Sequence, residues 1–135
     1  MIGLVIVTHG RLAEEFLSAM EHVVGPQRNV RAIAIGADDD MERRRRDIVA
    51  AARGVDDGGG VILLTDMFGG TPSNLGMTFL EADQLEVITG VNLPMLIKLA
   101  SLSSALDLLA VARAMRDHGR SAIWVASDLL RGEKG

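Results

Sequence analysis

Apolar residues gather in short runs that alternate with longer amphipathic stretches. The runs are continuous and rich in valine, isoleucine and leucine rather than strictly alternating, which is typical of strands covered on both faces of a parallel sheet. They predict strands over residues 2–7, 30–35, 60–65 and 122–126, and a less apolar run predicts another over residues 85–89.

The stretches between the runs have helical spacing with recognisable ends. An apolar face recurs from Leu12 to Val23, before Gly25 and Pro26 stop the pattern. The remaining helix signals are Asp38 to Asp40 as caps with Gly54 as the end of that helix, Thr71 before Pro72, Asn92 before Pro94, and Ser104 three residues before Asp107 in a helix that ends at Gly119. Strand and helix therefore alternate along the chain.

That alternation predicts an α/β fold. We expect one domain over residues 1–135, with an open, doubly wound, mostly parallel sheet and helices on both faces. In such sheets ligands bind beyond the carboxyl ends of the strands, where the strand order reverses. The first and third predicted strands both end in polar groups, at residues 8–10 and 65–66. The functional site is therefore expected at this edge.

Composition narrows the function classes. The 135 residues include no cysteine, which excludes disulfides, thiolate nucleophiles and cysteine-based zinc sites. A net charge of −4 and an aromatic content of 3% argue against a nucleic-acid binder. The first residues lack the basic segment of a secretory signal, and the longest apolar region is broken by Pro94, Lys98 and Asp107. We expect a cytoplasmic protein that does not insert into the membrane.

A histidine and an aspartate follow strands that are expected to be neighbours. His9 ends the first strand beside Gly10, whose lack of a side chain lets the chain turn and a second group approach. Asp66 ends the third strand. A carboxylate that accepts the proton of one ring nitrogen fixes the tautomer and leaves the other nitrogen as a nucleophile. The carboxylate also stabilises the positive charge that develops when that nitrogen attacks phosphorus, so this pair is the candidate catalytic centre.

A glycine-rich turn, FGGTPSN, comes soon after the aspartate. Gly69 and Gly70 free backbone N–H groups for close approach, and Thr71 begins a helix whose N-terminus attracts anions. The segment is not a Walker A loop, because no G-x-x-x-x-G-K-[ST] pattern occurs. We expect a phosphoryl group on His9 to be held at this turn.

Each of these features alone has a structural explanation, and their coincidence on one sheet edge makes them a site candidate. His22 and His118 are interpreted as surface residues of helices, and the arginines at positions 43–46 as a solvated helix face. Met67 and Phe68 border the candidate site, either as core filler or as an apolar rim for another protein.

Three ordered motifs match a known family. The motifs IVTHG, TDMFGGTPSN and VITGVNLPML resemble the IIA component of mannose-type bacterial sugar phosphotransferase systems, the class that serves mannose, fructose and sorbose. The likeness covers nearly the whole chain, and three motifs in this order are far more specific than THG alone.

The resemblance implies a role for each candidate residue. His9 matches the phosphorylated histidine, and Asp66 matches the aspartate that orients it. Thr71 falls where the family carries Ser or Thr, beside the Gly-Gly turn that binds phosphate. The residues expected to support this site are Gly10, Phe68, Ser73, Asn92 and Pro94. No metal, nucleotide or organic cofactor is implied.

Partners follow from the same resemblance. It implies a phosphocarrier that receives a phosphoryl group from phospho-HPr and passes it to a separate IIB protein, and a homodimer whose interface includes the last strand. Two alternatives remain: a free-standing regulatory IIA protein whose phosphorylation state controls a target protein, and a phosphotransferase subunit of a dihydroxyacetone kinase. A histidine phosphatase would need an arginine before His9 and further cations, whereas Thr8 stands there.

Overall fold

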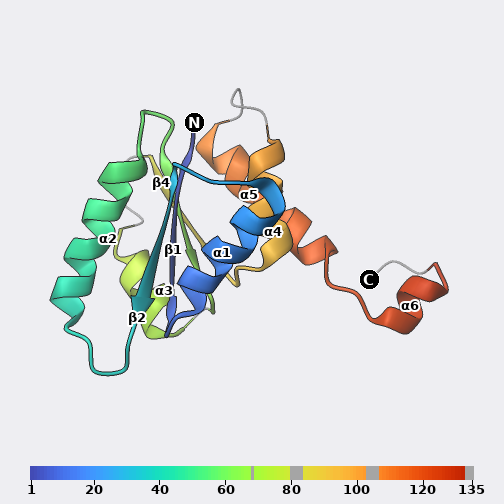
Figure 1. The fold of residues 1–135 in the computed structure, drawn as a ribbon, viewed down its shortest axis with the longest axis horizontal. Coiled ribbons are helices and arrows are strands. Elements are labelled where there is room, and N and C mark those ends of the chain that lie inside the picture. Colours follow the sequence, from blue (N-terminus) through green and yellow to red (C-terminus); the bar gives the residue numbers. More distant parts are fainter. Residues whose placement is uncertain (68, 80–83, 103–106, 133–135) are drawn as a thin grey trace.

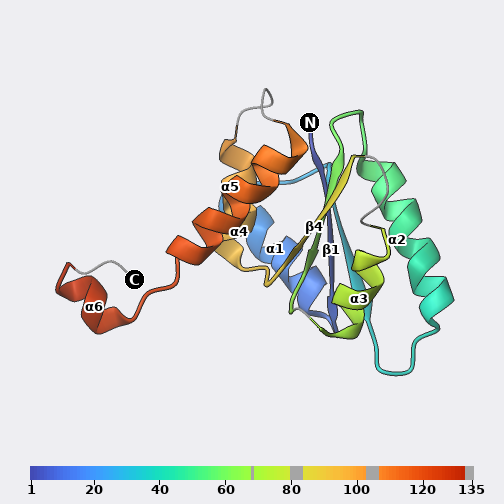
Figure 2. The ribbon, with the colours of Figure 1, turned by 180° about the vertical axis from the view of Figure 1, so that it is seen from behind.

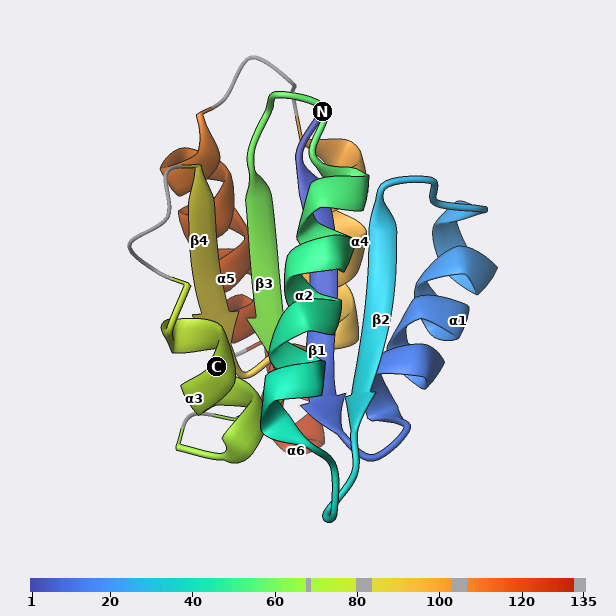
Figure 3. The same ribbon diagram turned by 90° about the vertical axis from the view of Figure 1, so that its left-hand side faces the viewer.

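Four parallel strands form the centre of the molecule, in the order β2-β1-β3-β4. The computed structural model describes residues 1–67, 69–79, 84–102 and 107–132. The strands are β1 (Gly3–His9), β2 (Val30–Ile35), β3 (Val61–Thr65) and β4 (Leu85–Thr89). All four point the same way, so their carboxyl ends share one edge of the sheet (Figure 3). The predicted neighbours β1 and β3 pair directly, with Val7 opposite Thr65.

Helices cover both faces of this sheet because side chains alternate along each strand. Leu4 and Ile6 face one cluster of buried residues, whereas Val5 and Val7 face the other. The first face carries α1 (Leu12–Val24), α4 (Leu93–Ser101) and α5 (Leu108–Ser121), and the second carries α2 (Met41–Val55) and α3 (Thr71–Met77) (Figures 1 and 2). The α/β, doubly wound architecture expected from the sequence is confirmed.

The helix caps follow the predicted chemistry in most places. Asp40 accepts a hydrogen bond from the N–H of Glu42 at 3.0 Å, and Asp107 accepts one from the N–H of Ala110 at 2.7 Å. Ser104 of the predicted capping box lies outside the described residues.

Three predicted helix ends were wrong by one or two residues. Gly70, not Thr71, is the N-cap of α3, so Thr71 is already helical. The helix α2 continues past Gly54 to Val55, and α5 continues past Gly119 to Ser121. A lone glycine only weakens a helix, and in neither place does a left-handed residue follow at once to stop it.

The predicted fifth strand is wrong. Residues 122–125 form no ladder, and α6 (Ala126–Leu130) follows them. We call residues 122–132 the C-terminal arm; it extends away from the sheet and its helices (Figures 1 and 2). Ile123 and Val125 are 68% and 65% exposed. A strand forms only where its backbone groups find a partner, and among the described residues no strand pairs with the arm.

Two of the four arginines expected on a solvated face are instead engaged. Arg44 pairs with Asp39 and Asp47, at 2.9 Å and 2.7 Å. Arg45 lies 4.7 Å from the centre of the Phe79 ring and donates a hydrogen bond to the hydroxyl of Thr78. The contacts of Arg45 join α2 to the end of α3. Within the described ranges, no helix has both the length and the apolar character needed to cross a membrane.

Candidate functional site

The structure brings the predicted histidine and aspartate into direct contact. His9 is the last residue of β1 and Asp66 directly follows β3. The ring nitrogen Nδ1 of His9 lies 2.8 Å from Oδ2 of Asp66, and the same oxygen accepts the main-chain N–H of His9 at 3.1 Å. The other carboxylate oxygen accepts the N–H of Met67 at 3.0 Å. One residue therefore supplies two of the three donors that hold the carboxylate.

The electrostatics of the pair favour one arrangement of protons. The His9 side chain is 48% exposed, whereas that of Asp66 is 14% exposed. Partial burial raises the pKa of the Asp66 carboxyl, but the hydrogen bonds from the His9 ring and main chain and the charge of His9 outweigh it, so the pKa lies below its ordinary value. An ionised carboxylate only accepts hydrogen bonds. Nδ1 of His9 therefore carries a proton, and in the neutral ring Nε2 holds the free lone pair.

Gly70 packs directly against this ring. A Cβ atom at position 70 would lie 2.6 Å from Cε1 and 3.0 Å from Nε2 of His9, closer than real Cβ contacts allow. The backbone of Gly70 is extended, so the close approach to the ring, and not a special conformation, requires glycine there. Gly69 is different, because its φ of +90° favours glycine while its position is open. The Gly-Gly turn thus brings Nε2 of His9 onto the start of α3.

The first turn of α3 offers backbone donors beside the ring. The N–H groups of Thr71 and Ser73 belong to the first turn and have no acceptor inside the helix, while Pro72 has no N–H. Thr71 is exposed and lines a hollow of about 470 Å³ together with His9 and Met41. Ser73 is fully buried, and its hydroxyl has no hydrogen-bond partner in the part of the chain that is described. Ser73, expected to support the site, is therefore not exposed to a phosphoryl group at the surface.

Gly10 supports the site for one of the two expected reasons. Its φ of +54° is left-handed, which lets the chain turn from β1 into α1. Apart from its two chain neighbours, no atom of the described residues lies within 4 Å of a Cβ built on Gly10, so no second group packs closely against this position. Phe68, also predicted to support the site, lies outside the described residues.

Asn92 and Pro94 lie at the same sheet edge but serve the helices behind it. Oδ1 of Asn92 accepts the N–H of Met95 at 3.0 Å as the α4 cap, and Nδ2 donates to the carbonyl of Gly119 at 3.0 Å. Pro94 is in the first turn of α4. A Cβ at Gly119 would lie 2.8 Å from Cε of Met95, so this glycine allows α4 and α5 to pack closely. The structure does not bring these residues to His9.

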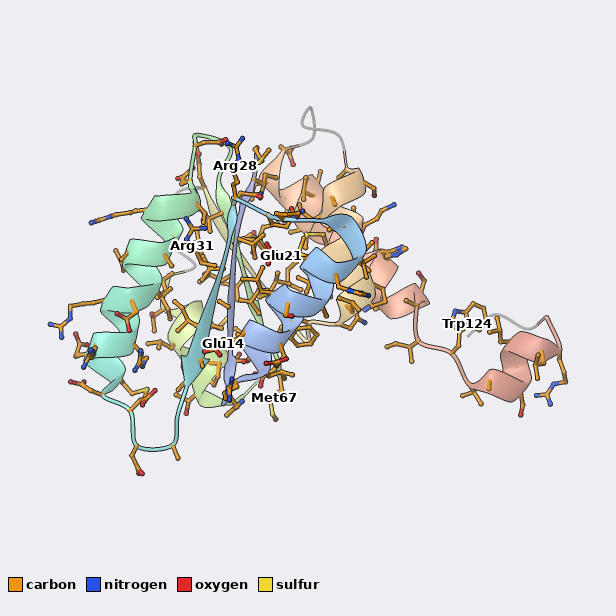
Figure 4. The ribbon with its side chains drawn as sticks, in the orientation of Figure 1. Glu14, Glu21, Arg28, Arg31, Met67 and Trp124 are labelled. Carbon is orange, nitrogen blue, oxygen red and sulfur yellow. The ribbon has the colours of Figure 1, made fainter. Side chains whose placement is uncertain are left out.

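Two methionines contribute apolar surface next to the site. Met67 is 55% exposed, and its Cγ lies 3.6 Å from the position of a Cβ on Gly70 (Figure 4). Met41, which was not among the predicted site residues, lines the hollow with His9. The sequence could have indicated Met41, because it is the first residue after the Asp40 cap. The start of the helix that follows β2 lies at the same sheet edge as the end of β1. Both methionines are exposed.

A second hollow lies along the outer edge of β4. It has a volume of about 370 Å³ and is bounded by β4 and α5, with Arg113, Arg116 and Arg120 on the helix side. Within the described sheet, strand β4 pairs only with β3, so no strand covers its other edge. Ile123, at the root of the C-terminal arm, reaches the same hollow. Nowhere in the described ranges do three or more His, Cys, Asp or Glu residues gather as a metal site.

Comparisons with known proteins identify relatives over most of the chain. The family model described as PTS system fructose IIA component matches residues 3–115. The mannose-specific EIIAB component of the Escherichia coli K12 PTS is 36% identical over 98 residues, which are 72% of this chain and 30% of that protein. The fructose-specific EIIA component of the Bacillus subtilis 168 PTS is 26% identical over 135 residues, 99% of this chain and 92% of that protein.

Solved structures agree with these relatives. A phosphotransferase system component EIIA from Streptococcus agalactiae has a TM-score of 0.81 at 28% identity, covering 94% of this chain and 98% of that one. A mannose/sorbose-specific IIA subunit from Enterococcus faecalis has a TM-score of 0.80 at 28% identity, covering 91% and 92%. The chain spans 30% of the length of the Escherichia coli relative, and nearly all of the length of these two.

Proposed function

The chain belongs to the family of PTS system fructose IIA components, and from that membership we propose that it carries a phosphoryl group between two proteins. In this proposal His9 accepts the group from phospho-HPr and passes it to a IIB protein. The observation that supports it most is the contact between Nδ1 of His9 and Asp66, which leaves Nε2 free on an exposed side chain.

The proposed transfer is an exchange of one nitrogen–phosphorus bond for another. The lone pair on Nε2 of His9 forms a bond to phosphorus while the bond from phosphorus to the donor nitrogen breaks, and that electron pair returns to the donor ring. Positive charge develops on the His9 ring and is stabilised by the Asp66 carboxylate through the Nδ1 proton. In the second step the acceptor attacks phosphorus and His9 leaves as a neutral imidazole.

The transferred oxygens need donors close to Nε2. Gly70 packs against that nitrogen, and Thr71, which has an N–H and a hydroxyl, lines the same hollow as His9. We assign Gly69, Gly70 and Thr71 to phosphate binding, because backbone N–H groups at a helix start attract anions. Donors held at this turn would meet the transferred oxygens without rearranging, which favours the transfer.

Labelling from phosphoenolpyruvate with purified enzyme I and HPr tests this function. The wild-type protein is expected to take up label and to lose it when a mannose-type IIB protein is added. His9→Gln is expected to take up none. His22→Gln is the matched control, because His22 is an exposed histidine on α1 far along the chain from the site. Label on His9→Gln, or label that IIB cannot remove, would refute the phosphocarrier role.

We further propose that the protein is a homodimer whose interface includes the C-terminal arm. The arm carries Ile123, Trp124 and Val125 with exposed fractions of 68%, 40% and 65%, in a sequence with strand character. The open edge of β4 offers the backbone groups that such a strand lacks in one copy. Sedimentation equilibrium at micromolar concentration is expected to give twice the mass of one chain, and a single-chain mass would contradict the dimer.

A further inference from the structure

A buried threonine precedes each of the two paired side chains. Thr8 comes directly before His9 and Thr65 directly before Asp66, and both threonines are fully buried. Their hydroxyls nevertheless differ. Oγ1 of Thr8 makes two hydrogen bonds, whereas Oγ1 of Thr65 has no partner among the described residues. The two positions therefore form a natural pair for comparison.

The hydroxyl of Thr8 joins the end of β1 to the start of α1. It accepts the N–H of Ala13 at 2.6 Å and donates to the carbonyl of His9 at 3.2 Å. Arg11 occupies the N-cap position of α1 but makes no side-chain cap bond there. Thr8 therefore caps α1 from the strand, across the turn that carries His9.

The contact between the ring and the carboxylate depends on the main chain of His9. Oδ2 of Asp66 accepts both the N–H and Nδ1 of the same residue, at 3.1 Å and 2.8 Å. Both bonds persist only while the His9 backbone keeps one orientation. Asp66 holds that backbone at its N–H, and Thr8 holds it at its carbonyl.

We propose that Thr8 is a positioning residue for phosphoryl transfer. Its hydroxyl fixes the main chain at His9, so that Nδ1 stays on Asp66 and Nε2 stays against Gly70. The proposal rests on the proposed function of His9. It assigns Thr8 no contact with the transferred group.

Substitution of each threonine by valine separates the bonded hydroxyl from the unbonded one. Valine replaces the hydroxyl by a methyl group of similar size, so at position 8 it also leaves the N–H of Ala13 without its acceptor. For Thr8→Val, the maximal rate of labelling by phospho-HPr is expected to fall by about tenfold or more, with an unchanged half-saturating HPr concentration. Thr65→Val is expected to label like the wild type. Thr8→Ser, which keeps a hydroxyl, is expected to restore most of the rate.

A second readout needs no phosphoryl donor. The nitrogen chemical shifts of the His9 ring, measured by NMR on unphosphorylated protein, report which nitrogen carries the proton. Wild type and Thr65→Val are expected to show the Nδ1–H form, and Thr8→Val a mixture of both tautomers. If Thr8→Val does not fold, Thr8→Cys replaces it, since a thiol is a weak donor and acceptor of similar size and predicts an intermediate result.

The outcomes separate this inference from the proposed function. If the wild type takes up no label, the proposed function fails, and the NMR comparison still decides the role of Thr8. A Thr8→Val protein that labels at the wild-type rate would overturn the inference. So would an equal loss in Thr65→Val, or an unchanged ring tautomer in Thr8→Val.

Discussion

The carboxyl edge of the sheet and the C-terminal arm differ in how many of their side chains find contacts within a single chain. At the edge, His9 and Asp66 come from neighbouring strands and satisfy each other through two hydrogen bonds. On the arm, Trp124 is 40% exposed and lies apart from the sheet and its helices (Figure 4), and Leu130 is 88% exposed. At the edge the two polar side chains already have hydrogen-bond partners, whereas on the arm apolar side chains are exposed to solvent.

This difference follows from what each region needs. Hydrogen-bonded pairs need only two groups brought within about 3 Å, and parallel strands bring their ends together automatically. A strand needs a whole neighbouring strand, and an apolar side chain needs a surface that excludes water. Changes at the edge should therefore affect the chemistry of one copy, and changes on the arm should affect assembly.

Gly70→Ala is the variant that should break the edge most severely while keeping His9. The added Cβ would lie 2.6 Å from Cε1 of the ring, so the ring must move off its position. The labelling rate is expected to fall by about a hundredfold. The control is Gly54→Ala, whose Cβ meets open space in α2 and should leave labelling unchanged while raising stability by about 0.5–1 kcal/mol. A normal rate in Gly70→Ala would mean that the ring does not act from this position.

Asp66→Asn should weaken the same edge less. The amide keeps an oxygen for the N–H of His9 but removes the negative charge beside the ring. Labelling is expected to slow by about tenfold without disappearing. Rates measured at a saturating concentration of phospho-HPr test this. An unchanged rate would remove the orienting role of Asp66.

The pH dependence of the unfolding free energy should differ between the wild type and Asp66→Asn. Because the pKa of Asp66 is lowered in the folded state, unfolding is accompanied by proton uptake near that pKa. The stabilisation is fully present above the unfolded value and is lost as the pH falls through the lower folded value. The unfolding free energy of the wild type should therefore exceed that of Asp66→Asn at neutral pH, and the gap should narrow below about pH 4. Urea denaturation at several pH values measures it, and a constant gap would contradict the lowered pKa.

Gly10→Ala should produce a smaller loss at the edge. The position has a φ of +54° and open space around it, so only the left-handed backbone opposes a side chain. The unfolding free energy is expected to fall by about 1 kcal/mol. Gly10→Asn should lose less, because asparagine tolerates this conformation better. Equal stability of all three proteins would show that the turn does not need glycine.

Trp124→Asp should have the smallest effect on one copy of the chain. Because Trp124 lies on the arm, the rate of labelling at His9 should stay within about twofold of the wild type, and the stability of the monomer within about 0.5 kcal/mol. The dimer is expected to dissociate in sedimentation experiments. Val23→Asp, an exposed apolar position on α1, is the control and should leave the assembly intact. A stable dimer of Trp124→Asp would remove the arm from the interface.

The sequence predicted all four strands of the described sheet and the edge where the candidate site lies, and it predicted one strand, over residues 122–126, that does not form. The runs in β1 and β3 are buried on both faces by helices of the same chain, so their local pattern and their surroundings agree. Residues 122–126 carry a similar pattern but form no strand. An apolar run indicates that the side chains of a segment are favourable to bury. It does not indicate whether other elements of the same chain bury them.

Details of the site depended on tertiary contacts that no local pattern reports. The sequence predicted a glycine-rich turn that includes Gly70. The residue that makes glycine necessary there is His9, whose ring reaches this turn from the end of β1. The family resemblance also predicted Asn92 as a supporting residue of the site, although its side chain donates a hydrogen bond to the carbonyl of Gly119 in α5. The predicted cap of α3 was one residue too late, because proline is accepted at either of the first two helical positions and does not fix where the helix begins.

The central claim is that Asp66 holds Nδ1 of His9 so that Nε2 receives the phosphoryl group. Phosphorus and nitrogen NMR of the protein labelled through enzyme I and HPr tests it most directly, because the two phosphohistidine isomers have different shifts. We predict phosphorus bonded to Nε2 of His9, with the proton retained on Nδ1. A phosphoryl group on Nδ1, or on any residue other than His9, would contradict the account.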